Sequence, residues 1–283
     1  MFRLAVPLAV LSVVYLIARL RSRHTGRKHT ISWLPKGGAD ALAQLGIFVF
    51  ADLLYETVRG VAESNEAVPF QNARTIISTE KALHFFVEQS VQSWAMGHRF
   101  LIDFANFMYV NSHFVITTSA LVWLYLRHND RFYFVRNMFV VAMGFALVGY
   151  LLVPTAPPRF FPELGFVDTI AYYVNVKHDS GFVTLFFNPY AAVPSMHVAF
   201  ALLISMPAML IVRRKVFKAL WAIYPLVIAF VVVVTGNHWV MDALAGAAVA
   251  AASAIVSLRV LSRLRPAAWS WVPRPHEATK ATI

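Results

Sequence analysis

Two short polar segments in an otherwise apolar chain carry residue types suited to nucleophilic and proton-transfer chemistry. They are Val193-Pro-Ser-Met-His197 and Gly236-Asn-His-Trp-Val-Met-Asp242. His238 and Asp242 are four residues apart, so they share a face wherever a helix includes both. The carboxylate can then accept a hydrogen bond from one imidazole nitrogen and leave the other unprotonated for attack. His197, at the head of another predicted helix, can give a proton to a departing oxygen.

Residues that suit an anionic phosphate lie near these histidines. Arg159 ends the segment Pro154-Thr-Ala-Pro-Pro-Arg159, whose prolines favour a rigid extended turn, and its guanidinium can hold two phosphate oxygens. Helix starts also present free backbone N–H groups and the positive end of the helix dipole. The other candidate substrate-binding residues are Ser195, Asn237, His113 and Lys177. Structural alternatives stay open: Arg159 as a membrane-surface anchor, Ser195 as a helix cap, and the polar stripe around His113 as a helix–helix contact.

The elements that must position these residues are membrane spans. The chain has 283 residues, of which 59% are hydrophobic and 14% charged, and its mean hydropathy is +0.60. Soluble domains contain fewer apolar and more charged residues, so we predict an all-α, polytopic membrane helix bundle. A span needs about 20 mostly apolar residues. The seven predicted spans are Leu4–Leu20, Ala41–Arg59, Ala105–Leu126, Phe134–Val153, Ser195–Val212, Phe217–Thr235 and Trp239–Leu258.

The distribution of Lys and Arg predicts the orientation of these spans. Eighteen of the 25 lie after the first, third and fifth spans, including the start of the fourth, and in the carboxy-terminal tail. By the positive-inside rule that side is cytoplasmic, which places the amino terminus and all three polar segments at the extracytoplasmic face of the cell membrane. Span Leu4–Leu20 precedes Arg21 and Arg23 and lacks a small-residue cleavage site, so it is predicted to be an anchor and not a signal peptide. Glu80–Glu88 is predicted to form an interfacial helix.

The predicted organisation has one catalytic domain with two additions. Residues 1–40 form an extra amino-terminal span and a basic loop, residues 41–260 a six-helix catalytic membrane domain, and residues 261–283 a cytoplasmic tail. The net charge of +11 is attributed to cytoplasmic loops, so no nucleic-acid partner is expected. The chain has no cysteine, which excludes disulfides, thiolate metal sites and thiol nucleophiles.

The polar segments resemble a known family. Pro194-Ser-Met-His197 and His238-x-x-x-Asp242 resemble the second and third signature motifs of the type 2 phosphatidic acid phosphatase superfamily. Ala156-Pro-Pro-Arg159 and Tyr109-x-x-x-His113 are similar to its inositol phosphorylceramide synthase-like branch, which contains inositolphosphotransferases. The resemblance implies a six-helix core with the motifs at the outer helix ends and a mechanism without a metal or other cofactor. In that mechanism His238 forms a phosphohistidine, Asp242 orients it, and His197 protonates the leaving group.

The chain departs from the family pattern at its cations. Leu152 stands where the first motif has a lysine, and Val232 where the third motif has an arginine. Phe160 replaces a proline and Met196 a glycine. Two of three expected phosphate-binding cations are therefore missing, and the candidates to replace them are Lys177, His178 and Arg99. Related lipid phosphotransferases also keep the triad with a degraded first motif, which favours transfer over hydrolysis.

Three functions compete at this stage. The leading one is a phosphotransferase that moves a phosphoryl-linked headgroup from a membrane lipid to an alcohol such as inositol. The second is a phosphatase that acts on a lipid phosphate or polyprenyl diphosphate, with water as acceptor. The third is a non-catalytic transport or lipid-binding protein, disfavoured because the chain shows no repeat or broken mid-membrane helix. A zinc site is the less favoured chemistry, since two histidines and one carboxylate supply three ligands. The oligomeric state is left open.

Overall fold

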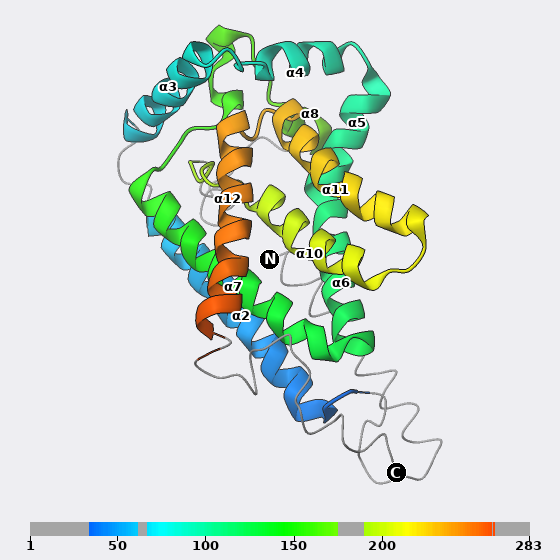
Figure 1. The fold of residues 1–283 in the computed structure, drawn as a ribbon. Helices are drawn as coiled ribbons and strands as arrows, with labels where there is room; N and C mark the ends of the chain where they lie inside the picture. The colour runs from blue at the N-terminus through cyan, green and yellow to red at the C-terminus, as the bar shows by residue number, and fades with distance from the viewer. Residues whose placement is uncertain (1–33, 62–66, 175–189, 262, 264–283) are drawn as a thin grey trace, which may run out of the picture.

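The described part of the protein is helical throughout, with connecting loops and no strand. It comprises residues 34–61, 67–174, 190–261 and 263 of a computed structural model (Figure 1). The α-helices are α2 Gly37–Val61, α3 Ala67–Ala82, α4 Glu88–Met96, α5 Arg99–Phe107, α6 His113–Arg127, α7 Asn129–Leu152, α8 Thr169–Val174, α10 Met196–Ile211, α11 Lys215–Val234 and α12 Val240–Val256. Short π-helices at Met108–Ser112 and Ser257–Leu261 extend α5 and α12, and 3-10 turns lie at Pro158–Phe160 and Pro162–Leu164. The predicted all-α fold class is confirmed.

Four helical segments are long and apolar enough to cross a membrane. They are Arg99–Arg127, Asn129–Leu152, Lys215–Val234 and Val240–Leu261, and each contains most of a predicted span. The predicted span Ser195–Val212 is the apolar helix α10, which has only 16 residues. The predicted span Ala41–Arg59 lies within α2, whose 25 residues are interrupted by charged side chains and which is not among the four. Leu4–Leu20 lies outside the described residues, so the total of seven spans stays a prediction.

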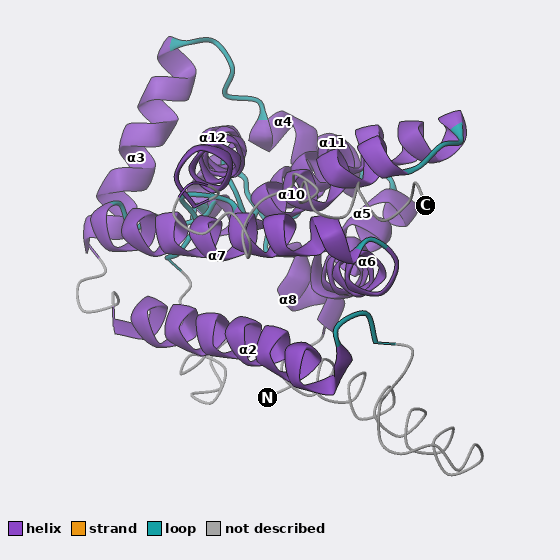
Figure 2. Ribbon diagram, turned by 60° about the horizontal axis from the view of Figure 1, so that its bottom comes forward, coloured by secondary structure: helices purple, strands orange, loops and turns teal. Residues whose placement is uncertain are grey.

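Helix α10 lies at the centre of the bundle, and its contacts with the surrounding helices hold its first turn in place. It packs against α6, α7, α11 and α12. On one side Phe200 stacks on Phe139 of α7 at 4.7 Å between ring centroids. On the other side Val198 and Ala201 belong to a buried cluster with residues of α11. Helix α2 lies along the outer side of α7 (Figure 2).

Helices α3 and α4 form a cap over the end of the bundle where α12 begins (Figure 1). The predicted helix Glu80–Glu88 is wrong, because α3 ends at Ala82, α4 begins at Glu88, and His84 between them has a left-handed φ of 59°. In one helix the two glutamates would be about 12 Å apart along the axis. The break lets both buried carboxylates reach the start of α12.

One end of the bundle carries the segments of the candidate site, and the other end carries basic loops. The segments after α7 and before α10 and α12 meet under the cap, whereas the α6–α7 and α10–α11 connections lie at the other end, with Arg127, Arg131 and Arg213–Lys215 (Figure 1). Arg136, a basic residue at the start of the predicted fourth span, is not in a loop: it is buried within α7, where it donates to Gln44 of α2 and to Asn137. The candidate site and the basic loops therefore lie at opposite ends.

Candidate active site

Backbone hydrogen bonds join the three predicted segments into one site. The bonds run from Thr155 N–H to the Tyr190 carbonyl at 2.7 Å, from Arg159 N–H to the Gly236 carbonyl at 2.9 Å, and from Ser195 N–H to the Asp242 carbonyl at 2.9 Å. Beside the first of these bonds, an isolated parallel bridge joins Thr155 and Ala191. Each segment is thus tied to at least one other, so motifs far apart in the sequence act as one rigid unit.

Trp239 fastens two of these segments from inside. Its side chain is fully buried, and its indole Nε1–H donates to the Ala156 carbonyl at 2.9 Å. Phe161 and Phe166 pack edge-on against the indole, each at 5.6 Å between ring centroids. The sequence analysis gave Trp239 no role, because a lone tryptophan at a span start is an ordinary interfacial residue.

One ring nitrogen of His238 is held by a hydrogen bond. Helix α12 begins at Val240, so His238 precedes the helix and does not share a helical face with Asp242. Its Nδ1 lies 2.9 Å from the Ala192 carbonyl oxygen, which can only accept, so Nδ1 carries the hydrogen. In the neutral ring Nε2 is then unprotonated and nucleophilic. Asp242 Oδ2 lies 3.4 Å from the same Nδ1 and accepts the Trp239 backbone N–H at 2.9 Å.

His197 lies in the first turn of α10, and its ring faces that of His238. The two ring centroids are 5.9 Å apart. Tyr109 stacks on His197 at 4.3 Å and 21°, and His113 lies 5.1 Å from it. The two residues that make these contacts lie in, and directly after, the π-helical turn Met108–Ser112. A π-helical turn widens the helix locally, and such turns are frequent at functional sites. The predicted histidine pair is therefore brought together.

The polar stripe on the predicted third span divides into two parts. Asn106 bonds with Thr169 of α8 at 2.8 Å, which is a helix-to-helix contact. His113 reaches the site, where its Nδ1 lies 2.9 Å from the Tyr224 hydroxyl of α11. Its Nε2 is buried without a hydrogen-bond partner among the described residues. Both polar contacts join helices, as the helix–helix alternative predicts, and a substrate-binding role for His113 stays a prediction.

Arg159 is aimed by its neighbours. Its Nη1 donates to the Asn237 side-chain oxygen, and its Nε lies 3.8 Å from Asp168 Oδ2. Asn237 in turn donates from Nδ2 to the hydroxyl and the carbonyl of Thr235 at 2.8 and 3.2 Å. The Asn237 amide that was expected to face a phosphate is thus used within the protein, where it orients the guanidinium of Arg159.

Ser195 directly precedes the first turn of α10 but does not cap it by its side chain. Its Oγ is fully buried and has no hydrogen-bond partner in the described part of the chain. Its carbonyl lies against α12, where a Cβ on Gly246 would be only 2.2 Å away. An uncapped helix start with an unsatisfied hydroxyl beside His197 is suited to receive the oxygens of an anion.

Gln92 of α4 is a contributor that the sequence analysis missed. It is buried, donates to the Val167 and Val234 carbonyls at 3.1 Å each, and accepts the Val167 N–H at 2.9 Å. It also lies against Gly236, whose φ of 70° and close approach to Gln92 leave no room for a Cβ. An isolated Gln on a polar helix gives no sequence signal of this role.

The two positions where the family pattern has a cation hold apolar side chains, which contribute no charge to the site. Leu152 is 74% exposed, and Val232 is fully buried. Arg99 is exposed and pairs with Asp103 at 3.6 Å, and none of its described contacts reaches the histidines. Lys177 and His178 lie outside the described residues. Arg159 is therefore the cation that the described residues place next to the two histidines through Asn237 and Gly236.

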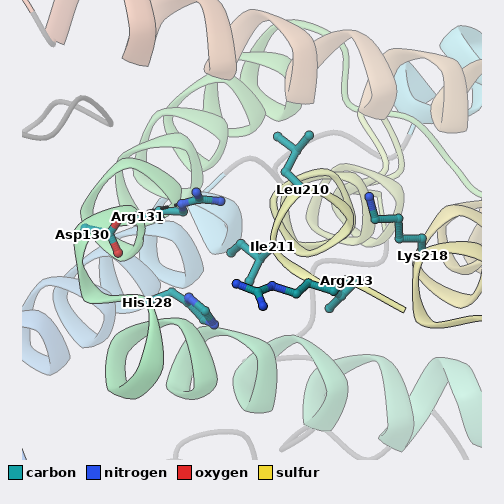
Figure 3. Close-up of a pocket in the computed structure, with 8 residues that line it drawn as sticks. His128, Asp130, Arg131, Leu210, Ile211, Arg213 and Lys218 are labelled. Carbon is teal, nitrogen blue, oxygen red and sulfur yellow. Dashed lines mark ion pairs between the residues drawn. The ribbon is translucent and has the colours of Figure 1, made fainter. Parts of the chain in front are cut away.

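A cavity of about 580 Å³ lies away from the histidines, at the other end of the bundle. It sits between the α6–α7 and α10–α11 connections (Figure 3). Its lining includes His128, Asp130, Arg131, Arg213 and Lys218. In the described part of the chain no three His, Asp or Glu residues are grouped to hold a metal ion.

Comparison with known proteins gives one match. A family model described as the PAP2 superfamily matches residues 74–256, more than half of the chain. That range holds all three segments of the candidate site and the α3–α4 break. Searches of curated proteins and of solved structures found no match.

Proposed function

Because the chain belongs to the PAP2 superfamily of membrane phosphatases and phosphotransferases, we propose that it transfers a phosphoryl-linked headgroup from a membrane lipid through a phosphohistidine on His238. The observation that carries this proposal is the hydrogen bond from His238 Nδ1 to the Ala192 carbonyl, which leaves Nε2 as the nucleophile. The reaction takes place at the extracytoplasmic face, on the argument that the basic loops lie at the other end of the bundle.

In the first step His238 Nε2 attacks phosphorus and the bond from phosphorus to the leaving oxygen breaks. His197 gives its ring proton to that oxygen, whose partner group departs as an alcohol. The imidazole becomes a cation as the nitrogen–phosphorus bond forms, and Asp242, 3.4 Å from Nδ1, stabilises it. Arg159 and the α10 start with Ser195 bind the remaining phosphoryl oxygens, where negative charge gathers.

In the second step an acceptor O–H attacks the phosphohistidine. His197, now neutral, takes the acceptor proton, the nitrogen–phosphorus bond breaks, and His238 returns to its starting form. With an alcohol such as inositol the product is a new phosphodiester, and with water it is a phosphate monoester or free phosphate. No metal is required for either step.

The charge at the site favours a phosphodiester substrate over a phosphomonoester. The guanidinium of Arg159 is already shared with Asn237 and Asp168, and Leu152 and Val232 stand where the superfamily has cations. A phosphodiester carries one negative charge and a phosphomonoester close to two at neutral pH. A site with fewer cations therefore suits headgroup transfer, with lipid phosphate or polyprenyl diphosphate hydrolysis as the second candidate.

The proposal is tested on purified protein in detergent, with EDTA present. Wild type and the variants His238→Ala, His197→Ala and Asp242→Ala are incubated with phospholipids and lipid phosphates, with and without inositol, and products are followed by mass spectrometry. We expect chelator-resistant turnover that falls by at least about 1,000-fold in His238→Ala and by about 10²–10⁴-fold in the other two.

His128→Ala is the matched control, since this histidine lies at the opposite end of the bundle and should leave turnover unchanged. A phosphorylated peptide containing His238, trapped by acid-free quenching, would identify the intermediate directly. Turnover that survives the loss of His238 would remove the catalytic assignment. An inositol-dependent product identifies transfer, and free phosphate regardless of inositol identifies hydrolysis.

A further inference from the structure

Three carboxylates meet at the first turn of α12, directly behind the proposed nucleophile. Asp242 Oδ2 accepts the Trp239 N–H at 2.9 Å, Glu88 Oε1 accepts the Val240 N–H at 2.8 Å, and Glu80 Oε1 accepts the Met241 N–H at 2.8 Å. All three residues are fully buried. Successive N–H groups at the helix start are thus satisfied by side chains from α12 itself, α4 and α3.

The second oxygen of each carboxyl group has no donor. Glu80 Oε2, Glu88 Oε2 and Asp242 Oδ1 are buried without a hydrogen-bond partner among the described residues. Neither glutamate forms an ion pair with a described Lys or Arg. Val240 and Met241 are adjacent, so the Glu88 and Glu80 carboxyl groups that accept their N–H groups lie side by side. Two ionised carboxylates buried side by side would be very costly. A single proton between them forms a hydrogen bond and removes one of the charges.

The surroundings of Glu80 favour the protonated form. Burial, the hydrogen bond with Glu88, and the nearby charges of Glu88 and Asp242 raise the pKa of Glu80 to about 9, against the opposing hydrogen bond from Met241 N–H. The remaining charged residues of the elements packed here point elsewhere. Lys81 lies over the Phe86 ring at 5.1 Å, Arg159 faces Asn237 and Asp168, and Arg74 and Glu163 are exposed.

We propose that Glu80 and Glu88 share one proton and act as positioning residues that fasten the α3–α4 cap to the turn carrying His238 and Asp242. The inference rests on the function proposed above. The pair keeps the first turn of α12 fixed, and it limits the negative charge behind the site to a level that an anionic substrate tolerates. Neither glutamate touches the reacting atoms.

The proton has a defined effect on stability. Between the ordinary Glu value of 4.5 and about 9, the folded protein keeps a proton that the unfolded chain has released. Unfolding therefore releases a proton in this window, and the free energy of unfolding falls as pH rises through it. Above about pH 9 the pair loses the proton, and two negative charges face each other beside Asp242.

Glu80→Gln and Glu80→Ala separate this role from simple packing. In Glu80→Gln the amide oxygen still accepts from Met241, and the amide N–H takes the place of the shared proton to Glu88. We expect its kcat/KM to stay within about threefold of wild type at pH 7. Both proteins lose activity at high pH as His197 loses its acidic proton, but the ratio of the variant's kcat/KM to that of wild type should rise between pH 7 and pH 9.5. Glu80→Ala leaves the Met241 N–H and Glu88 unsatisfied, and should lose at least about tenfold at pH 7, mainly in kcat.

Melting temperature measured against pH provides a readout that needs no turnover. Relative to wild type, the Tm of Glu80→Gln should rise by at least about 2–4 °C between pH 6 and pH 9.5, because the variant has no proton to lose. The controls Glu163→Gln and Glu163→Ala change an exposed glutamate of the 3-10 turn Pro162–Leu164 and should follow wild type in both readouts.

Three results would overturn the inference: Glu80→Ala with wild-type turnover, Glu80→Gln as impaired as Glu80→Ala, or an unchanged dependence of Tm on pH in Glu80→Gln. Failure of the proposed function has a different signature, namely turnover that persists in His238→Ala. In that case the Tm comparison still decides whether the two glutamates share a proton.

Discussion

Asn237 shows how a short side chain can orient a long one at the candidate active site. Arg159 has four rotatable bonds and would sample many positions beside the site, but the Asn237 oxygen takes one of its Nη1 hydrogens. Asn237 is itself held by Thr235. The chain Thr235–Asn237–Arg159 thus presents a guanidinium whose direction is set before substrate binds.

Replacing Asn237 with Ala should therefore lower activity without unfolding the protein. We expect kcat/KM to fall by roughly 10–100-fold, since a hydrogen bond to a charged group contributes about 1.5–3 kcal/mol. Steady-state kinetics on a phospholipid substrate checks this. Asn129→Ala, which removes a bond to the Tyr125 carbonyl far from the site, should behave as wild type. Equal kcat/KM values for Asn237→Ala and wild type would mean that Arg159 does not depend on Asn237 for its orientation.

At this scale the sequence identifies residues better than it identifies their partners. His197, His238 and Asp242 were predicted from type and spacing, and the structure brings them together. The Ala192 carbonyl as partner of His238 was not predictable, because every residue offers a carbonyl and only the fold selects one. The internal use of Asn237 was missed for the same reason.

Helices α10 and α12 approach each other so closely that one glycine decides their spacing. A Cβ on Gly246 would lie 2.2 Å from the Ser195 carbonyl oxygen and 3.1 Å from its carbonyl carbon. Both are backbone atoms and cannot rotate away. The contact sets the distance between the turn that holds His197 and the helix that holds Asp242.

Gly246→Ala should push these helices apart. We expect a loss of about 1–3 kcal/mol in the free energy of unfolding, as for other overpacked sites, together with at least a tenfold loss of turnover. Thermal unfolding in detergent and the activity assay measure the two effects. Gly144→Ala on α7, where a Cβ meets nothing within 4 Å, is the matched control and should be neutral. A wild-type Tm in Gly246→Ala would contradict the tight contact.

Among the elements, the long apolar helices were predicted more reliably than the helices of the α3–α4 cap. Runs such as that within Lys215–Val234 are long and nearly free of charge, so their helices follow from composition alone. The segment Glu80–Glu88 reads locally as a helix, yet it breaks because its two carboxylates accept hydrogen bonds from backbone N–H groups at the start of α12, more than 150 residues away. A long-range contact of this kind leaves no local pattern.

In the described part of the chain, the candidate site and the basic α6–α7 and α10–α11 connections lie at opposite ends of the bundle. The three site segments lie under the cap, while Arg127, Arg131 and Arg213–Lys215 lie on the far connections. This separation is what the positive-inside rule requires of a protein whose site faces outward.

Cysteine labelling tests this orientation directly, because the chain has no native cysteine. Ser78→Cys, on the exposed side of α3, should react with a membrane-impermeant maleimide in intact cells. Lys215→Cys, at the start of α11, should react only after permeabilisation. Labels exchanged between these two positions would reverse the topology and place the site in the cytoplasm.

The burial of His238 bears on how a lipid reaches it. The imidazole is only 5% exposed, and Ser195 and Asp242 are not exposed at all. A headgroup that contacts both His238 and Ser195 therefore needs the side chains around them to move aside. Where such a rearrangement precedes binding, the apparent dissociation constant exceeds the intrinsic one by the inverse of the rearranged fraction. Substitutions of residues that surround the site without touching the headgroup are then expected to change substrate affinity.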